Sequence, residues 1–237
     1  MLDTILFDLD GTLLPMRQED FIKAYITQLC RRYIPCGYDK ENIVKALWTA
    51  TMAMVKNDGT RSNETCFWDS FNLRLGDTEL IRSTLPSFYT REFDDIREII
   101  TPTNLPRLII DTLQSKGYTL VLATNPLFPP VGVATRLSWI GLLPTDFCRV
   151  TTYSNSTFCK PSLGYYEEIL RIIGKTPEQC CMVGNNPGED LVAGDLGLSV
   201  YLVTDFLENA QALPTEGYPQ GSLESVLAWA RRLPSLR

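Results

Sequence analysis

Two acids, Asp8 and Asp10, stand one residue apart at the end of the short apolar segment 5–7, and Gly11-Thr12 follows them. Like charges this close are costly unless a cation or a shared proton stabilises them. Mg²⁺ takes oxygen ligands and is commonly held by one or two carboxylates together with a substrate phosphate. The pair therefore predicts metal-assisted chemistry on phosphate. The alternative is that the two acids only cap a turn or the start of a helix.

Three later apolar segments, residues 118–123, 180–183 and 198–203, also end in polar residues. Near-continuous apolar segments of this kind are typical of strands in a parallel sheet that is covered on both faces. Ligands of such sheets bind in the crevice beyond the carboxyl ends of the strands. We therefore expect the polar residues at these ends to surround one crevice together with the first acidic pair. They include Thr124, Asn125, Asn185 and Asn186.

Helical patterns alternate with the apolar segments, over residues 105–116, 161–173 and 222–233. This alternation predicts an α/β fold, a Rossmann-like parallel sheet with helices on both faces. Residues 16–100 carry only helical apolar spacing, with apolar stripes over residues 22–33, 43–54 and 67–75 and a fourth helix expected over 88–100. We therefore predict an α/β core domain formed by residues 1–15 and 101–237. Residues 16–100 should form a small all-helical cap domain, placed to act as a lid over the crevice.

Composition narrows the chemistry. The 237 residues contain no histidine, which excludes Ser-His-Asp and Cys-His nucleophilic machinery. Lys and Arg number 22 against 28 Asp and Glu, so the net charge of −6 argues against nucleic acid or an anionic membrane as a partner. Catalysis must therefore rest on carboxylates, Lys, Thr, Tyr or Cys.

The cysteines and the N-terminal residues indicate in which cell compartment the protein is expected. Seven cysteines, with no Cys-x-x-Cys pair, indicate buried free thiols rather than a disulfide framework or a zinc site. The first residues carry an acid where a signal peptide would need basic residues, and no apolar run approaches the ~18 residues of a membrane span. We therefore expect a cytoplasmic protein.

The segment Asp8-Leu9-Asp10-Gly11-Thr12-Leu13 resembles the signature of the haloacid dehalogenase superfamily, most of whose members are phosphatases. Three further segments resemble its later motifs in order: Thr124, Lys160 before Pro161, and the stretch 184–190. The resemblance covers about residues 1–14 and 100–205. The helical insert is similar to the cap of members that act on small phosphorylated or halogenated molecules.

This resemblance implies a magnesium-dependent phosphomonoesterase that acts on a small phosphorylated metabolite. Asp8 would be the nucleophile that forms an aspartyl-phosphate, and Asp10 would be its acid-base partner. The hydroxyl of Thr124 and the backbone N–H of Asn125 would bind the phosphoryl oxygens. Lys160 would neutralise charge on the phosphate and the nucleophile. The expected catalytic side chains are thus Asp8, Asp10, Thr124 and Lys160.

The implied Mg²⁺ ligands are Asp8, the backbone carbonyl of Asp10, Asp190, and either Asn185 or Asn186. Active members usually have an acid at the position that these two amides occupy. An amide oxygen is a neutral ligand, so Mg²⁺ should bind less tightly here than in relatives with two acids. The alternative is that both asparagines only form the turn before a helix.

Two other functions compete with hydrolysis of a phosphate ester. Dehalogenases of the superfamily use the same nucleophile without a metal, but they lack the second acid of the first motif, so Asp10 disfavours that activity. A binding module with a weakened metal site would bind without turnover. Specificity should lie in the cap, where the polar or aromatic candidates are Arg17, Lys56, Arg61 and Trp68.

Overall fold

A six-stranded sheet forms the centre of the molecule in the computed structural model, which describes residues 1–237. Its strands run in the order β3-β2-β1-β4-β5-β6, and every neighbouring pair is parallel. The predicted α/β fold is therefore confirmed, although the two-residue edge strands β3 and β6 were not predicted. The strands are β1 Thr4–Phe7, β2 Thr119–Leu122, β3 Arg149–Val150, β4 Cys180–Gly184, β5 Ser199–Val203 and β6 Gln220–Gly221.

The apolar core lies on both faces of this sheet. Leu6 of β1 is in register with Val121 of β2 and Met182 of β4, and all three side chains belong to one buried cluster. Their chain neighbours point to the opposite face and join a second, larger cluster. Alternating side chains are therefore buried on both sides, which explains why these strands read as continuous apolar runs.

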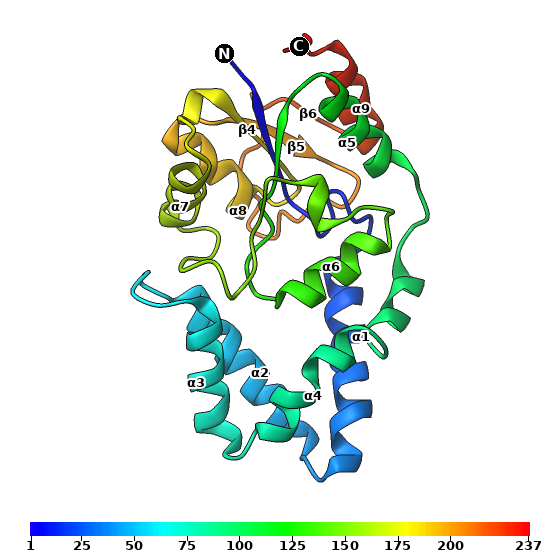
Figure 1. The fold of residues 1–237 in the computed structure, drawn as a ribbon, viewed down its shortest axis with the longest axis vertical. Helices are drawn as coiled ribbons and strands as arrows, with labels where there is room; N and C mark the ends of the chain where they lie inside the picture. The colour runs from blue at the N-terminus through cyan, green and yellow to red at the C-terminus, as the bar shows by residue number, and fades with distance from the viewer.

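Helices cover both faces of the sheet (Figure 1). Helix α7 packs on the smaller cluster, whereas α5 and α9 pack together on the larger one. The helices of the chain after residue 100 are α5 Leu105–Ser115, α6 Pro130–Ser138, α7 Leu163–Ile173, α8 Pro187–Asp190 and α9 Leu223–Arg232. Short 3₁₀ turns connect elements at Ile34–Cys36, Asp94–Ile99, Pro144–Asp146, Pro177–Gln179 and Leu191–Leu196.

Four helices inserted after β1 form a lobe beyond one end of the sheet (Figure 1). The aspartate and serine before α2 and α3 cap them by accepting backbone N–H groups. The larger apolar cluster runs continuously from the sheet into this lobe, so the domain bounds assigned from the sequence stay a prediction. The four helices are α1 Gln18–Tyr33, α2 Lys40–Val55, α3 Asn63–Leu75 and α4 Glu79–Tyr89.

The prediction of a fourth helix over residues 88–100 is wrong. Helix α4 ends at Tyr89, and residues 94–99 form a 3₁₀ helix instead. The backbone N–H of Phe93 donates to the carbonyl of Phe88, which closes a tight turn, and the Phe93 ring packs 4.9 Å from that of Tyr89. Burial of these three aromatic rings in one cluster therefore ends the helix where the spacing alone predicted continuation.

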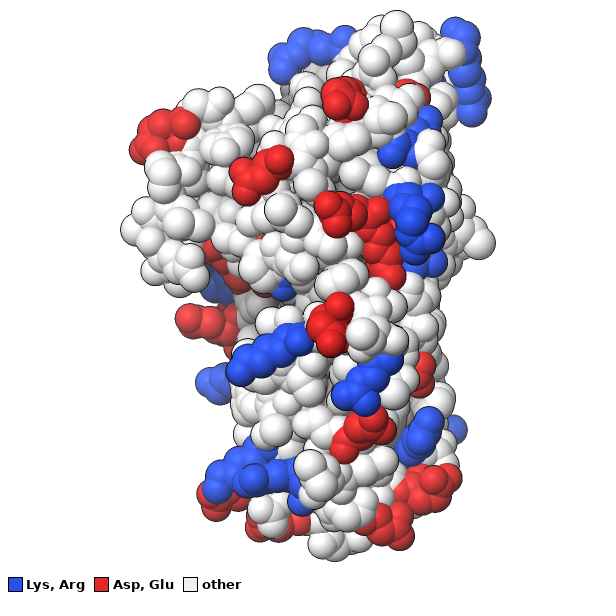
Figure 2. Space-filling view, turned by 90° about the vertical axis from the view of Figure 1, so that its left-hand side faces the viewer, with Lys and Arg blue, Asp and Glu red and all other residues white.

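The cysteines and the surface charges of the structure can be compared with the expectations from composition. All seven cysteines are free, and only Cys36 and Cys148 are exposed. Cationic and anionic side chains are intermingled over the face shown in Figure 2. None of the helices combines the length and the apolar character that crossing a membrane requires.

Candidate active site

The polar residues singled out in the sequence gather at the carboxyl ends of the central strands. Asp8 directly follows β1, Thr124 follows β2 by one residue, and Asn185 directly follows β4. Asp8, Asp10, Thr124 and Asn185 all line one pocket. This is the edge at which ligands bind to open parallel sheets.

The turn after β1 depends on Gly11. Its φ of +78° lies in the left-handed region that favours glycine. A Cβ there would also stand 2.2 Å from Nδ2 of Asn185. The turn is closed by the N–H groups of Thr12 and Leu14, which both donate to the carbonyl of Leu9. Glycine thus brings the β1 loop against the β4 loop and places Asp8 beside Asn185.

Lys160 joins the first and fourth motifs. Its Nζ lies 2.8 Å from Oδ1 of Asp8 and 2.7 Å from Oδ1 of Asp190, and its side chain is fully buried. The second oxygen of Asp8 accepts a long hydrogen bond of 3.3 Å from Thr12. The second oxygen of Asp190 accepts the backbone N–H of Asn186 at 3.0 Å.

Burial and the charges of this cluster shift the pKa values of Asp8 and Lys160. Burial raises the pKa of Asp8 to about 7; Lys160 opposes the rise, while Asp190 and Asp10 add to it. Burial alone would lower the pKa of Lys160, but the two carboxylates beside it raise that pKa overall. The lysine therefore stays charged, and its charge is needed to hold two buried acids close together.

We expect the substitution Lys160→Met to lower the free energy of unfolding by about 3 kcal/mol, because it leaves two buried carboxylates without their cation. The matched control is Lys175→Met, which removes an ion pair 2.8 Å long with Asp3 whose side chains are 22% and 28% exposed. That control should cost no more than about 1 kcal/mol. Urea unfolding of both variants measures the difference, and equal losses would contradict this account of Lys160.

The two asparagines of the fourth motif are used differently. Oδ1 of Asn185 accepts the hydroxyl of Thr12 at 3.1 Å, so its amide oxygen lies close to Asp8, which the same hydroxyl contacts. Oδ1 of Asn186 instead accepts the N–H of Gly188 at 2.9 Å and caps α8. The turn-forming alternative thus describes Asn186, and Asn185 is the amide that faces the acids.

Arg136 is a functional candidate that the sequence analysis missed. It is fully buried on α6, donates from Nη1 to Oδ2 of Asp10, and has its guanidinium 4.3 Å from the centre of the Phe128 ring. Oδ1 of Asp10 has no hydrogen-bond partner in the protein. Asp10 lines the pocket, and it thus has one oxygen fixed by the arginine and the other without a partner.

A signal for Arg136 was present in the sequence. It lies three residues after Val133 and directly before Leu137, on the stripe of α6 that is buried. A charged residue on an apolar helical stripe requires a partner, and this helix was not predicted. Its partner could not be read from the chain, since Asp10 lies 126 residues away.

We expect Arg136→Met to destabilise the fold by about 3 kcal/mol, because the half-buried carboxylate of Asp10 loses its fully buried cation while the apolar stem of the arginine is preserved. The exposed pair of Arg61 and Asp69 provides the control, and Arg61→Met should cost less than about 1 kcal/mol. Thermal unfolding followed by circular dichroism gives both values. A stable Arg136→Met protein would show that Asp10 does not need the guanidinium.

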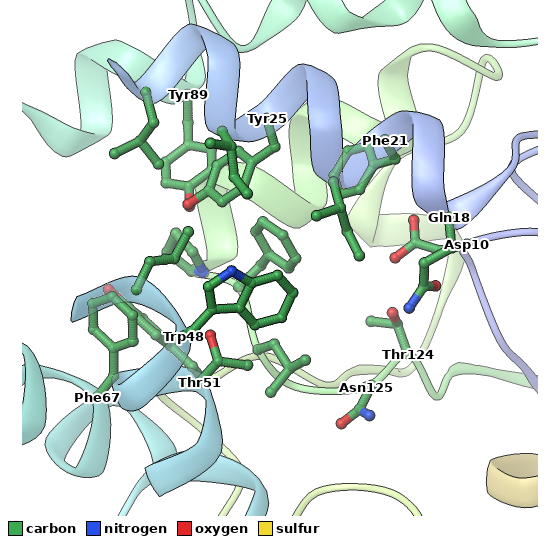
Figure 3. Close-up of a pocket in the computed structure, with 18 of the residues that line it drawn as sticks. Asp10, Gln18, Phe21, Tyr25, Trp48, Thr51, Phe67, Tyr89, Thr124 and Asn125 are labelled. Atoms are coloured by element: carbon green, nitrogen blue, oxygen red, sulfur yellow. The ribbon is translucent and has the colours of Figure 1, made fainter. Parts of the chain in front are cut away.

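The second motif forms a further wall of the pocket. The carbonyl of Thr124 accepts hydrogen bonds from Thr151 at 2.6 Å and Tyr165 at 2.9 Å, which fixes the backbone while the side chain stays at the pocket. Nδ2 of Asn125 donates to both carboxylate oxygens of Glu189 at 3.2 Å. Figure 3 shows Asp10, Thr124 and Asn125 at the same end of the pocket.

Of the four cap candidates named from the sequence, only Trp68 lines the pocket. Arg61 forms an exposed ion pair 2.7 Å long with Asp69, and Arg17 and Lys56 lie outside the lining. The charged candidates therefore do not reach the crevice, and the helical lobe presents aromatic side chains to it instead.

The fold and this site define an α/β protein with a cluster of carboxylates at the carboxyl end of a parallel sheet. Comparison with known proteins agrees. The profile of the haloacid dehalogenase-like hydrolases matches residues 2–195. The chain belongs to the haloacid dehalogenase-like hydrolase family, and it is an enzyme of the phosphatase and hydrolase class.

Two relatives show how far sequence similarity extends. The chain is 34% identical to a glyceraldehyde 3-phosphate phosphatase of Methanothermobacter thermautotrophicus over 113 residues, which is 46% of each protein, so the match spans about half of that relative. It is 24% identical to pyrophosphatase PpaX of Bacillus cereus over 193 residues, 81% of this chain and 78% of that one.

Solved structures share the fold. The phosphatase of the same superfamily from Thermococcus onnurineus superposes with a TM-score of 0.61 at 17% identity, over 96% of this chain and 97% of that one. L-2-haloacid dehalogenase from Xanthobacter autotrophicus gives 0.57 at 17% identity, over 98% of this chain and 100% of that one. Because phosphatases and dehalogenases both match, the fold alone does not choose between the two reactions.

Proposed function

We propose that this protein is a magnesium-dependent phosphomonoesterase that hydrolyses a small phosphate ester through a phosphorylated aspartate. The observation that carries the proposal is the buried cluster in which Lys160 contacts both Asp8 and Asp190 beside the pocket. Relatives named as a glyceraldehyde 3-phosphate phosphatase and a pyrophosphatase support transfer of a phosphoryl group to water.

In the proposed first step, a carboxylate oxygen of Asp8 attacks phosphorus, a new P–O bond forms, and the bond to the leaving oxygen breaks. Asp10 gives its proton to that oxygen, so the alcohol departs neutral. The unpartnered Oδ1 of Asp10 supports this role, since its other oxygen is held by Arg136. In the second step Asp10 takes a proton from water, which attacks phosphorus and releases Asp8 and phosphate.

Two further residues hold the transferred group in this proposal. The hydroxyl of Thr124 and the backbone N–H of Asn125 donate to the phosphoryl oxygens, and both residues line the pocket. Lys160 balances negative charge on Asp8 and the phosphate, which matters most where water is excluded. No membrane and no nucleic acid is required for this chemistry; the partner is a small phosphate ester.

The residues present fit a hard divalent cation. Three carboxylates, Asp8, Asp10 and Asp190, line the pocket, and Lys160 and Arg136 supply only two positive charges against them. The donors are all oxygens, as Mg²⁺ prefers. No group of three His, Cys, Asp or Glu forms a complete metal cluster. Backbone and amide oxygens would therefore have to complete a set built on the carboxylates of Asp8 and Asp190.

When bound, Mg²⁺ would neutralise charge on the phosphate and orient it for in-line attack. The carboxylates of Asp8 and Asp190 would hold it together with the backbone carbonyl of Asp10. Asn185 is favoured over Asn186 as the amide ligand, because the oxygen of Asn185 contacts the same Thr12 hydroxyl as Asp8, whereas the oxygen of Asn186 caps α8.

The proposal predicts that hydrolysis of 4-nitrophenyl phosphate requires Mg²⁺ and falls at least about a thousandfold in Asp8→Asn, since an amide oxygen is a poor nucleophile. Initial rates with Mg²⁺ and with EDTA measure the requirement. Asp195→Asn makes the same chemical change at an exposed acid and should keep full activity. Equal rates in EDTA would contradict the metal requirement, and full activity of Asp8→Asn would contradict the nucleophile.

The neutral amide at position 185 leads to a second expected result. Asn185→Asp adds a carboxylate beside Asp8 and should lower the half-saturating Mg²⁺ concentration by about tenfold. Asn186→Asp keeps the helix cap, because aspartate and asparagine cap equally well, and should change that concentration much less. Metal titrations followed by activity and by calorimetry compare the two, and a larger effect at position 186 would reverse the assignment.

A further inference from the structure

The pocket that begins at the acids continues far into the helical lobe. Its volume is about 200 Å³, and 16 of its 28 lining residues are hydrophobic. Figure 3 shows Tyr25 and Tyr89 on one side facing Trp48, Thr51 and Phe67 on the other. All four helices of the lobe contribute to this apolar part. Examples are Phe21 of α1, Leu47 of α2, Phe71 of α3 and Leu85 of α4.

Charge is confined to one end of this pocket, and it is negative. The charged lining residues are Asp8, Asp10, Glu189, Asp190 and Glu208, and no lysine or arginine belongs to the lining. The nearby cations, Lys160 and Arg136, are fully buried. Lys160 is ion-paired to Asp8 and Asp190, and Arg136 is ion-paired to Asp10. A second anionic group on a substrate, such as a carboxylate or another phosphate, would therefore enter the lobe without a cation to pair with it.

The lobe also offers few hydrogen bonds. The hydroxyl groups of Tyr25 and Tyr89 lie 3.0 Å apart, so one of them donates its proton to the other. The other polar groups from the lobe that Figure 3 labels beside the aromatic rings are the hydroxyl of Thr51 and the indole N–H of Trp48. A sugar or a polyol placed here would lose more hydrogen bonds to water than the walls could replace.

We propose that the leaving group of the substrate is an apolar alcohol or phenol, which lies between α1 and α4 on one side and α2 and α3 on the other. This inference rests on the proposed function, since it places the phosphoryl group at the acids. A cavity of this volume holds an aromatic ring or a short alkyl chain, given that an engineered cavity of about 150 Å³ binds benzene. Burial of such a group supplies the binding free energy that a charged substrate would draw from cations.

A homologous series tests the proposal. Propyl, pentyl and heptyl phosphate have alcohols of the same acidity, so a change in kcat/KM along the series reports binding rather than bond breaking. We expect kcat/KM to rise about three- to fourfold for each methylene until the pocket is full. Esters of the same length that end in a carboxylate should lose this gain. A flat series, or preference for the carboxylated esters, would overturn the proposal.

The matching alkylphosphonates separate this proposal from the proposed function, because they bind without being hydrolysed. Calorimetry should show the same three- to fourfold gain in affinity for each methylene. If no ester is hydrolysed but affinity rises with chain length, the proposed function fails and the apolar pocket stands. If esters are hydrolysed and phosphonate affinity does not rise with length, the apolar pocket fails and the proposed function stands.

A pair of variants on α2 locates the effect. Thr51→Arg places a cation among the lining residues, and we expect the preference for alkyl over carboxylated esters to fall by about tenfold. Met52→Arg adds the same charge at the next residue, which is 45% exposed and outside the lining, and should leave the preference unchanged. An equal shift in both variants would show that the overall charge, rather than the pocket, sets specificity.

Discussion

One buried ammonium holds the site together. Nζ of Lys160 contacts carboxylates from two separate segments, Asp8 after β1 and Asp190 at the end of α8. Without it, two acids could not remain buried side by side. Gly184 makes the arrangement possible, because a Cβ at that position would stand 2.1 Å from Oδ2 of Asp190. The ends of β1 and β4 are therefore positioned by an electrostatic contact as well as by the strand register.

The pocket has a charged end at the sheet and apolar walls in the helical lobe. The loops and helices at the carboxyl edge of the sheet supply the acids and their buried cations, Lys160 and Arg136, whereas the lobe supplies aromatic side chains with no charge inside the pocket. Apolar walls exclude water, and exclusion of water strengthens the interactions of the charged end of the pocket with a phosphoryl group. The same walls select what is attached to the phosphate. Reaction and specificity thus rest on different elements of one continuous cavity.

The central strands and the residues that follow them were predictable, because an apolar run and its polar end are local features of the chain. Asp8, Thr124 and Asn185 therefore lie where the sequence placed them, at one edge of the sheet. Contacts between distant segments were not predictable. The pairing of Arg136 with Asp10 depends on how α6 packs, and the turn after Tyr89 depends on the aromatic cluster. Local patterns contain no information about either partner.

Capture of the phosphorylated enzyme tests the central claim, that Asp8 attacks phosphorus, most directly. The protein would be mixed with a saturating aryl phosphate and Mg²⁺, quenched in acid within a single turnover, digested and mapped by mass spectrometry. The account predicts phosphate on the N-terminal peptide at Asp8, and none in the Asp8→Asn variant. Turnover with no phosphorylated peptide, or phosphate on another residue, would contradict it.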